Sequence, residues 1–312
     1  MKGLELSKRF FEECGRPLFE REIPELMDRM AFGLVGEGSE CFGFDDEVSR
    51  DHDFEPGFCV WLTDEDYERF GFRLERLYAS LPKEFRGFRR QMLSPVGGNR
   101  HGIMTISGFY SRFLGSDTAP KTLEHWLYLP EYALASATNG RVFEDVLGVF
   151  SDVRGTLLSG YPKDVRLKKM AAHAILLFQG GLYNYERCIR HGERGAAQLA
   201  VFEFVDHALS LIYLLNNRYR PFYKWAYRAM RALPLLSELE MPLVTLTVKG
   251  NEVSDVKEKL NIMEEIGTYL LKALHQEGWL SAPAANMEEA AYALQGKIPA
   301  ESLRNMHIME GV

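Results

Sequence analysis

Two carboxylates in the N-terminal half of the chain have the spacing of a metal site. The run Asp51-His52-Asp53 precedes a strand that the apolar residues from Phe58 to Leu62 predict. Side chains alternate across a strand, so Asp51 and Asp53 are expected on one face and His52 on the other. Two close carboxylates cannot both stay ionised without a cation between them. Oxygen ligands favour a hard ion, so the pair predicts a site for Mg²⁺, with Mn²⁺ as the alternative.

A glycine-serine pair lies upstream of these carboxylates. Gly38 and Ser39 are separated from Asp51 by a spacer of eleven residues. The backbone N–H groups and the hydroxyl of such a turn can bind the phosphates of a ligand. Ser49, two residues before Asp51, is predicted to join the nucleotide-binding residues. Phosphate binding beside a metal ion indicates an enzyme that handles nucleotides.

Other motifs fit this stretch less well. The run from Gly36 to Gly38 resembles the start of a dinucleotide fingerprint, but Cys41 stands where the third glycine belongs. An EF-hand loop counted from Asp45 needs glycine at position six and glutamate at position twelve. The chain has Arg50 and Pro56 at these positions. A solvated acidic turn is the commonest fate of a charge run, but it does not explain the flanking Gly-Ser pair and apolar strand.

Together these motifs resemble a known family. Gly-Ser followed by Asp-x-Asp is similar to the signature of the nucleotidyltransferase superfamily related to DNA polymerase beta. Three strings in the chain resemble the bacterial branch of this superfamily that is called domain of unknown function 4037. They are GSECFGFDDEVSRDHDF, YNYERC and NNRYRPFYKW. The two-domain layout resembles that of kanamycin nucleotidyltransferase, and the resemblance covers most of the chain.

The resemblance implies a metal-dependent nucleotidyltransferase. Such an enzyme moves NMP from an NTP, with ATP expected here, to a hydroxyl or amine of a small-molecule acceptor. One alternative is a catalytically inactive nucleotide-binding or regulatory protein. It stays open because His101 to Ser107, around a predicted second sheet strand, lacks the third carboxylate that the superfamily often carries there. The other alternative is an RNA-modifying or RNA-binding protein, although RNA is not the favoured partner.

Positive charge gathers in the middle of an acidic chain. The net charge is −7, yet the segment from Arg154 to Arg231 has 13 Lys and Arg against 5 Asp and Glu. A basic segment beside an acidic metal site suits a bound triphosphate. From this segment we predict Arg187, Arg190 and Lys224 as nucleotide-binding residues.

A long helix predicted from Arg194 to Asn217 supplies the general base. One face is apolar, and the other carries polar residues at spacings of three and four: Glu203, Asp206, His207, Ser210, Tyr213 and Asn217. Such a mixed polar face resembles the lining of a wet cleft. We predict Glu203 as the base that deprotonates the acceptor, with Asp206 as second choice.

The expected fold class is α+β, with two domains. Residues 1–146 form a nucleotidyltransferase-like α/β domain with a small mixed sheet, and residues 147–312 form a helical bundle that binds substrate. Leu4 to Met30 reads as one or two helices with a break at Gly15-Arg16-Pro17. The state of the β-branched run from Met241 to Val248 is left open.

The composition indicates a cytoplasmic protein. Four scattered cysteines without a CxxC pair suit reduced thiols, and the N-terminus has no apolar signal-peptide core. No membrane partner is expected, because the uninterrupted apolar stretches are short. A homodimer is left open as an assembly.

Overall fold

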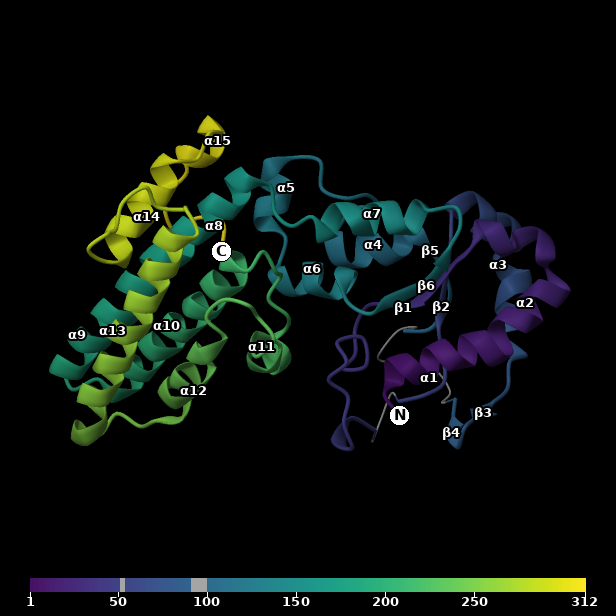
Figure 1. Ribbon diagram of the computed structural model, residues 1–312, viewed down its shortest axis with the longest axis horizontal. Helices are drawn as coiled ribbons and strands as arrows, with labels where there is room; N and C mark the ends of the chain where they lie inside the picture. Colours follow the sequence, from purple (N-terminus) through teal and green to yellow (C-terminus); the bar gives the residue numbers. More distant parts are fainter. Residues whose placement is uncertain (51–53, 91–99) are drawn as a thin grey trace. The chain divides into compact units, whose positions relative to one another are not determined.

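The computed structural model describes residues 1–50, 54–90 and 100–312 (Figure 1). Its contacts divide them into two compact units. Unit 1 holds Met1–Pro120 and Tyr132–Ser159, and unit 2 holds Lys121–Glu131 and Gly160–Val312. The α+β fold class is confirmed, since the described strands all lie in unit 1. The domain limit predicted between residues 146 and 147 falls inside unit 1 and stays a prediction.

Unit 1 is built around a four-stranded sheet with the order β5-β2-β1-β6. Its strands are β1 (Ala31–Leu34), β2 (Cys59–Leu62), β5 (Gly102–Thr105) and β6 (Arg141–Asp145), and a separate hairpin pairs β3 (Glu84–Phe85) with β4 (Phe88–Arg89). β1 runs antiparallel to both β2 and β6, whereas β5 runs parallel to β2. The two central strands are buried throughout, which explains why the sequence shows them as continuous apolar runs.

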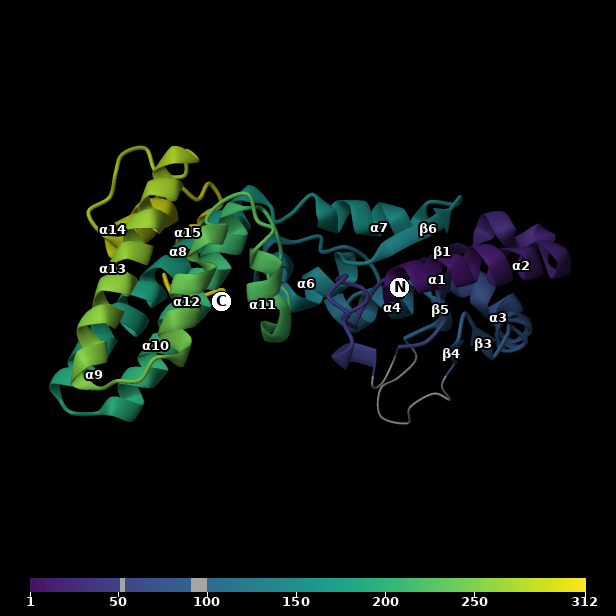
Figure 2. The same ribbon diagram turned by 60° about the horizontal axis from the view of Figure 1, so that its bottom comes forward.

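Helices cover both faces of this sheet (Figures 1 and 2). The helical elements of unit 1 are α1 (Gly3–Phe10), a π-helical turn (Phe11–Gly15), α2 (Arg16–Glu22), 3₁₀ turns at Pro24–Arg29 and Val48–Arg50, α3 (Asp64–Ala79), α4 (Ile106–Leu114), α6 (Glu131–Thr138, with Glu131 assigned to unit 2) and α7 (Val149–Leu158). On one face, Phe32 and Phe58 pack against Phe11 of the N-terminal helices. On the other face, Trp61 stacks on Phe150 with ring centroids 4.0 Å apart. Aromatic contacts of this kind add to the burial of apolar area that holds the helices on the sheet.

The helix break predicted near Gly15 does not occur. The chain stays helical from Gly3 to Glu22, and a π-helical turn at Phe11–Gly15 replaces the expected interruption. A Cβ atom on Gly15 would lie 2.5 Å from the Phe58 ring, so this glycine allows the helix to approach the sheet closely. Pro17 follows this π-helical turn as the second residue of α2.

The hydroxyl of Tyr78 in α3 is hydrogen-bonded to the backbone of Phe58, just before β2 begins. It accepts a hydrogen bond from the N–H of Phe58 at 3.0 Å and donates one to the Phe58 carbonyl at 2.8 Å. Tyr78→Phe leaves the buried N–H without this acceptor, so we expect the free energy of unfolding to fall by about 1–3 kcal/mol. Urea denaturation measures the loss. Tyr67→Phe on the same helix is the control, since its hydroxyl donates to Glu75 at the surface; equal losses in both variants would contradict the prediction.

Unit 2 is a helical bundle. Its helical elements are α5 (Leu123–Tyr128), α8 (Lys163–Leu176), a π-helical turn (Leu177–Tyr183), α9 (Asn184–Arg190), α10 (Arg194–Leu215), α11 (Tyr223–Met230), a 3₁₀ turn (Ser237–Leu239), α12 (Glu240–Val248), α13 (Val253–Gln276), α14 (Met287–Gly296) and α15 (Glu301–Arg304). α10 packs against α8, α9, α12 and α13. By length and composition α10 is apolar enough to cross a membrane, but 72% of that window is buried inside the protein. It is the core helix of its unit.

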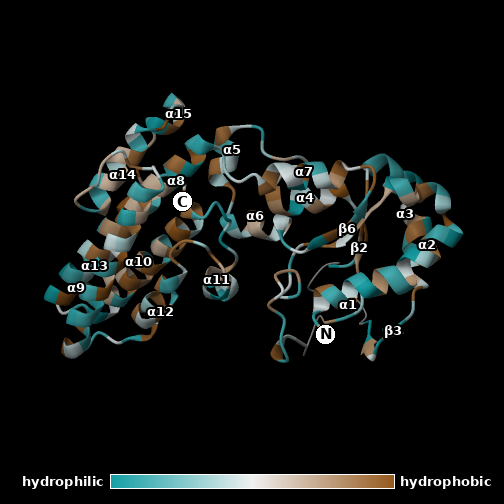
Figure 3. Cartoon of the chain, viewed as in Figure 1, coloured by the Kyte–Doolittle hydropathy of each residue, from teal (hydrophilic) through white to brown (hydrophobic). Residues whose placement is uncertain are grey.

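Packing decides the state of the run that the sequence left open. Glu240–Val248 is helix α12, although β-branched residues favour strands. It lies against α10 and α13, where Leu243 and Leu246 are fully buried. Figure 3 shows hydrophilic and hydrophobic residues alternating along the amphipathic helices α1 and α13, whose apolar sides face their own units.

Candidate functional site

One end of the sheet in unit 1 gathers four chain segments. The register pairs Gly33 with Cys59, Cys59 with Gly102, and Leu34 with Arg141. The chain therefore leaves β1 at the end where it enters β2, β5 and β6. The segments that meet there are residues 36–40, 54–58, 100–101 and 139–140, and we name this region the sheet-end site.

A glycine turn forms the first part of the sheet-end site. Gly36 and Gly38 have φ angles of +124° and +122°, a backbone region that side-chain-bearing residues rarely adopt. The amide of Asn139 fixes this turn, because it accepts a hydrogen bond from the Gly36 N–H at 2.9 Å and donates one to the Gly36 carbonyl at 2.6 Å. Ser39 is half-buried next to the turn. Asn139, which lies just before β6, thus fixes the turn that leads into the predicted phosphate-binding pair Gly38-Ser39.

Glu40 is a site residue that was not predicted from the sequence. Its side chain is only 8% exposed, and within the described residues its Oε1 atom has no hydrogen-bonding partner. A Cβ atom on Gly38 would lie 2.3 Å from Oε1, so the carboxyl group rests against the glycine turn. Burial raises the pKa of Glu40, opposed by the charges of His101 and Arg100. The sequence signal for this role was the position of Glu40 directly after Gly38-Ser39.

A histidine and a second glutamate complete the described part of the sheet-end site. His101 Nδ1 lies 3.3 Å from Glu55 Oε1, and both side chains are largely buried. The His101 ring packs on Gly57, where a Cβ atom would lie 2.7 Å from Nδ1. The expected third ligand near β5 was a carboxylate, so the histidine that precedes this strand was not among the predicted site residues.

The structure leaves the predicted metal ligands untested. Asp51 and Asp53 lie outside the described residues, and the proposal for them rests on the sequence. Over residues 1–50, 54–90 and 100–312, no group of three or more His, Cys, Asp or Glu side chains is arranged to hold a metal ion. The described residues therefore do not form a metal centre by themselves.

Residues of the neighbouring acidic segment have structural roles. The Ser49 hydroxyl donates to Asp46 Oδ1 at 3.0 Å and accepts from the Asp46 N–H at 3.1 Å, which closes a local turn. Asp45 is 2% exposed and accepts a hydrogen bond from the N–H of Gly3, the first residue of α1. This carboxylate satisfies a backbone donor at the helix start. Part of the acidic run thus supports α1.

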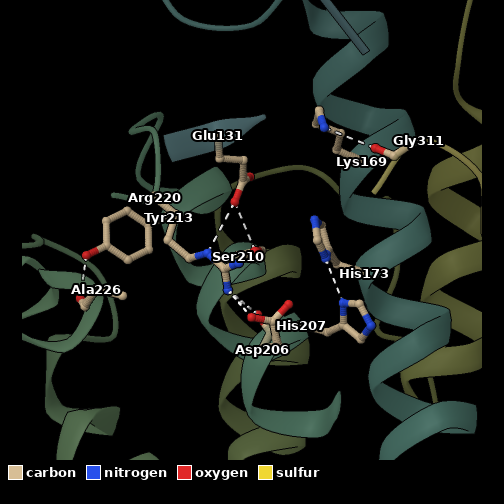
Figure 4. A network of polar contacts seen from close by, with 10 residues as sticks. All are labelled: Glu131, Lys169, His173, Asp206, His207, Ser210, Tyr213, Arg220, Ala226 and Gly311. Atoms are coloured by element: carbon tan, nitrogen blue, oxygen red, sulfur yellow. Dashed lines mark hydrogen bonds and ion pairs between the residues drawn. The ribbon is translucent and has the colours of Figure 1, made fainter. Parts of the chain in front are cut away.

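Unit 2 contains a buried polar network of its own (Figure 4). Glu131 Oε2 accepts a hydrogen bond from Ser210 Oγ at 3.0 Å and lies 3.5 Å from Arg220 Nε. Arg220 also donates to Asp206 Oδ1 at 2.7 Å. Burial raises the pKa of Glu131, while the charges of Arg220 and Lys169 oppose the shift. Within the described residues, Glu131 Oε1 and the buried hydroxyl of Tyr161 have no hydrogen-bonding partner.

The two predicted bases lie at the outer side of this network. Glu203 is 59% exposed, and its Oε2 atom lies 3.3 Å from Nε2 of His207, one turn later on α10. Asp206 is similarly exposed and is paired with Arg220. Nothing tests either residue as a base. The buried carboxylate is instead Glu131, which comes from a segment 79 residues earlier than its partner Ser210.

The predicted nucleotide-binding cations of unit 2 do not come together in a pocket that the structure defines. On α9, Arg187 donates to the Tyr183 hydroxyl at 3.2 Å, and Arg190 pairs with Glu186. Both partners lie one turn earlier on the same exposed surface. Lys224 is exposed near the start of α11. The roles of these cations remain predictions.

The buried histidines of unit 2 predict a loss of stability in mild acid. Burial lowers the pKa of both His173 and His207, whereas the histidine pKa in an unfolded chain is about 6.5. The unfolded state therefore binds more protons near and below pH 6.5. Their contribution is complete above about pH 6.5 and decreases as the pH falls, by at most about 1.4 kcal/mol per pH unit for each proton.

Urea denaturation at several pH values checks this expectation. His173→Asn removes one titrating ring, so its free energy of unfolding should decrease less than that of the wild type between about pH 7.5 and 5.5. His191→Asn changes an exposed histidine and serves as the control. Identical pH dependence in His173→Asn and the wild type would contradict the prediction.

Comparisons with known proteins match one segment of the chain to a family model. Residues 126–226 match the model of the family described as domain of unknown function (DUF4037). No curated protein matches the chain. The chain is similar to the crystal structure of a nucleotidyltransferase-like protein from Exiguobacterium sibiricum 255-15, with a TM-score of 0.38 and 12% sequence identity, covering 85% of this chain and 80% of that chain. The matched segment runs from α5 into α11 and includes Glu131, His173, His207 and Arg220. The segment 126–226 is thus similar to the DUF4037 family, in agreement with the resemblance that the sequence motifs indicated.

Proposed function

We propose that this protein is a metal-dependent nucleotidyltransferase, which moves NMP from an NTP to a hydroxyl or amine of a small-molecule acceptor. The supporting observation is the convergence at the sheet-end site: the Gly36–Glu40 turn leaves β1 where the chain enters β2. Asp51 and Asp53 precede this entrance in the sequence. We therefore assign phosphate binding and metal binding to the same end of the sheet.

The glycine turn is suited to phosphate. Because Gly38 carries no side chain, a phosphate can approach its backbone closely, while the Gly36 N–H is already hydrogen-bonded to Asn139. The Ser39 hydroxyl offers one further donor. The raised pKa of Glu40 favours its neutral form, which reduces the repulsion between this buried carboxyl group and an anionic ligand.

The remaining roles follow from the chemistry of phosphoryl transfer. Mg²⁺, or Mn²⁺ in its place, bound by Asp51 and Asp53 would neutralise charge on the triphosphate. The acceptor oxygen or nitrogen forms a bond to the α-phosphorus as the bond from that phosphorus to the bridging oxygen breaks and pyrophosphate leaves. The acceptor proton passes to a base, for which Glu203 and then Asp206 are the sequence-based choices. Arg187, Arg190 and Lys224 are assigned to the nucleotide, with ATP as the expected NTP.

A product search tests the proposal. The protein is incubated with Mg²⁺, each labelled NTP and a metabolite extract, and mass spectrometry follows any compound that gains the mass of an NMP group. Reactions with EDTA, and reactions with the Asp53→Asn variant, are the controls. We expect a nucleotidylated product and pyrophosphate only in the complete reaction. NTP binding without product would instead identify a nucleotide-binding protein that lacks turnover, and binding of RNA that weakens steeply with added salt would favour the RNA alternative.

A further inference from the structure

Two buried histidines of unit 2 face each other from different helices. His173 of α8 and His207 of α10 are 4% and 7% exposed, and their Nδ1 atoms lie 3.0 Å apart. His207 Nε2 lies 3.3 Å from Glu203 Oε2, at the exposed side of α10. Figure 4 shows the remaining ring nitrogen of His173 directed toward the part of the network that contains Glu131 and Lys169. A continuous polar path therefore leads from the interior to the surface.

The acceptors along this path determine where the protons lie. A neutral imidazole carries one N–H and one bare nitrogen, so only one of the facing Nδ1 atoms can donate. The Glu203 carboxylate accepts hydrogen bonds only, which requires Nε2–H on His207 and leaves its Nδ1 bare. His173 must then donate through Nδ1–H. Its Nε2 atom is consequently a bare acceptor inside unit 2.

The surroundings keep this inner nitrogen unprotonated at rest. Burial lowers the pKa of His173 strongly, and the charges of His207, Lys169 and Arg220 act in the same direction. Lys169 lies one turn earlier on α8 and donates to the Gly311 carbonyl at 3.0 Å. Glu131 and Asp206 are the carboxylates of this network, and Arg220 pairs with both. A bare nitrogen beside buried donors can accept a proton when a ligand supplies one.

We propose that His173, His207 and Glu203 form a proton relay that removes a proton from a hydroxyl or amine bound in unit 2 and delivers it to solvent. The O–H or N–H bond of the ligand breaks as His173 Nε2–H forms. The Nδ1 proton of His173 moves to His207 Nδ1, and the Nε2 proton of His207 moves to the Glu203 carboxylate, which releases it to water. After the product leaves, a proton from water re-enters through Glu203 and His207 to His173 Nδ1 while the Nε2 proton of His173 passes to water, which restores the resting tautomers.

This relay deepens the proposed function and rests on it for the identity of the ligand, which is the acceptor. It also changes the role of Glu203. From the sequence, Glu203 was predicted as the base itself, whereas in the relay it is the outer group and His173 is the inner one. The exposure of Glu203 then suits its task, because the outer group must exchange its proton with water.

Nuclear magnetic resonance of the ¹⁵N-labelled protein tests the relay without any substrate. We expect His173 as the Nδ1–H tautomer and His207 as the Nε2–H tautomer at neutral pH. Glu203→Gln should shift the protonation midpoint of the histidine pair to lower pH, because the carboxylate favours the charged form of His207. Glu265→Gln removes an exposed charge from α13 and should leave the midpoint unchanged. An Nε2–H tautomer of His173, or an unchanged midpoint in Glu203→Gln, overturns the relay.

A kinetic test uses His173→Asn, whose amide N–H can replace the Nδ1–H donor while the inner acceptor is lost. With the acceptor identified by the product search, we expect NTP binding to be retained and transfer to slow by about 100-fold or more. The pH dependence of the remaining rate should flatten. Transfer at the wild-type rate by a folded His173→Asn protein overturns the relay. If the wild type forms no product with any NTP, the proposed function fails, and the tautomers and midpoints still decide the relay by themselves.

Discussion

Asp51→Asn and Asp53→Asn are each expected to abolish Mg²⁺-dependent NTP binding while the protein stays folded. Each change removes an anionic ligand from a two-carboxylate site, so the cation and the triphosphate that it bridges are poorly held. The loss should be at least about 100-fold, since even the loss of an outer-shell partner lowers metal affinity by about 10- to 100-fold. Calorimetric titration with an NTP, with and without Mg²⁺, measures it.

Glu47→Gln is the matched control for these variants. Glu47 belongs to the same acidic segment and is exposed, so its removal lowers the local charge without removing a predicted ligand. We expect nearly wild-type NTP affinity from Glu47→Gln. If all three variants bind equally well, the segment is a solvated acidic turn and the metal assignment is wrong.

Gly140→Ala is expected to lower the free energy of unfolding by about 3 kcal/mol or more, a large effect for one added methyl group. Gly140 has a φ angle of +61° at the start of β6, and its N–H donates to the Cys41 carbonyl at 2.8 Å. An added Cβ atom would lie 1.9 Å from the carbonyl oxygen of Leu34. The overlap is with backbone, so relief requires β1 and β6 to separate beside the glycine turn.

Gly115→Ala is the control, because it introduces backbone strain without a steric overlap. Gly115 ends α4 with a φ angle of +64°, and no atom lies within 4 Å of the position of its added Cβ. Its cost should be about 1–2 kcal/mol, from the left-handed backbone conformation alone. Urea denaturation of both variants gives the comparison, and a similar loss in each would show that the contact with Leu34 is relieved at little cost.

Several elements were predictable because their signals are local. Thr63 followed by three acidic residues marks a helix start, and in α3 the Thr63 hydroxyl accepts a hydrogen bond from the Asp66 N–H. The apolar run from Phe58 to Leu62 predicted a strand, and β2 is found there, buried throughout. The α+β class follows from such runs in the first half and helical periodicity in the second. The glycine turn was also readable, because Gly36 and Gly38 allow positive φ angles.

Other features depend on partners that are distant in the sequence. The run at α12 is helical because it packs on α10 and α13, and this outweighs the strand preference of its β-branched residues. Glu40 appears in the sequence as one acid among many, yet α1 packs over it, since a Cβ atom on Gly3 would lie 2.5 Å from its own. That burial, which raises its pKa, has no sequence signature.

The buried network of unit 2 separates the two kinds of information most clearly. Helical spacing alone placed Glu203 and His207 on one face of α10, because residues four apart share a face. It did not reveal His173, which meets His207 across 34 residues of sequence, or Glu131, which meets Ser210 across 79. The amino-acid sequence by itself determined which groups can carry protons and phosphates. Only the tertiary structure decided which of them lose water and face one another, because desolvation and proton sharing depend on the neighbours that packing brings.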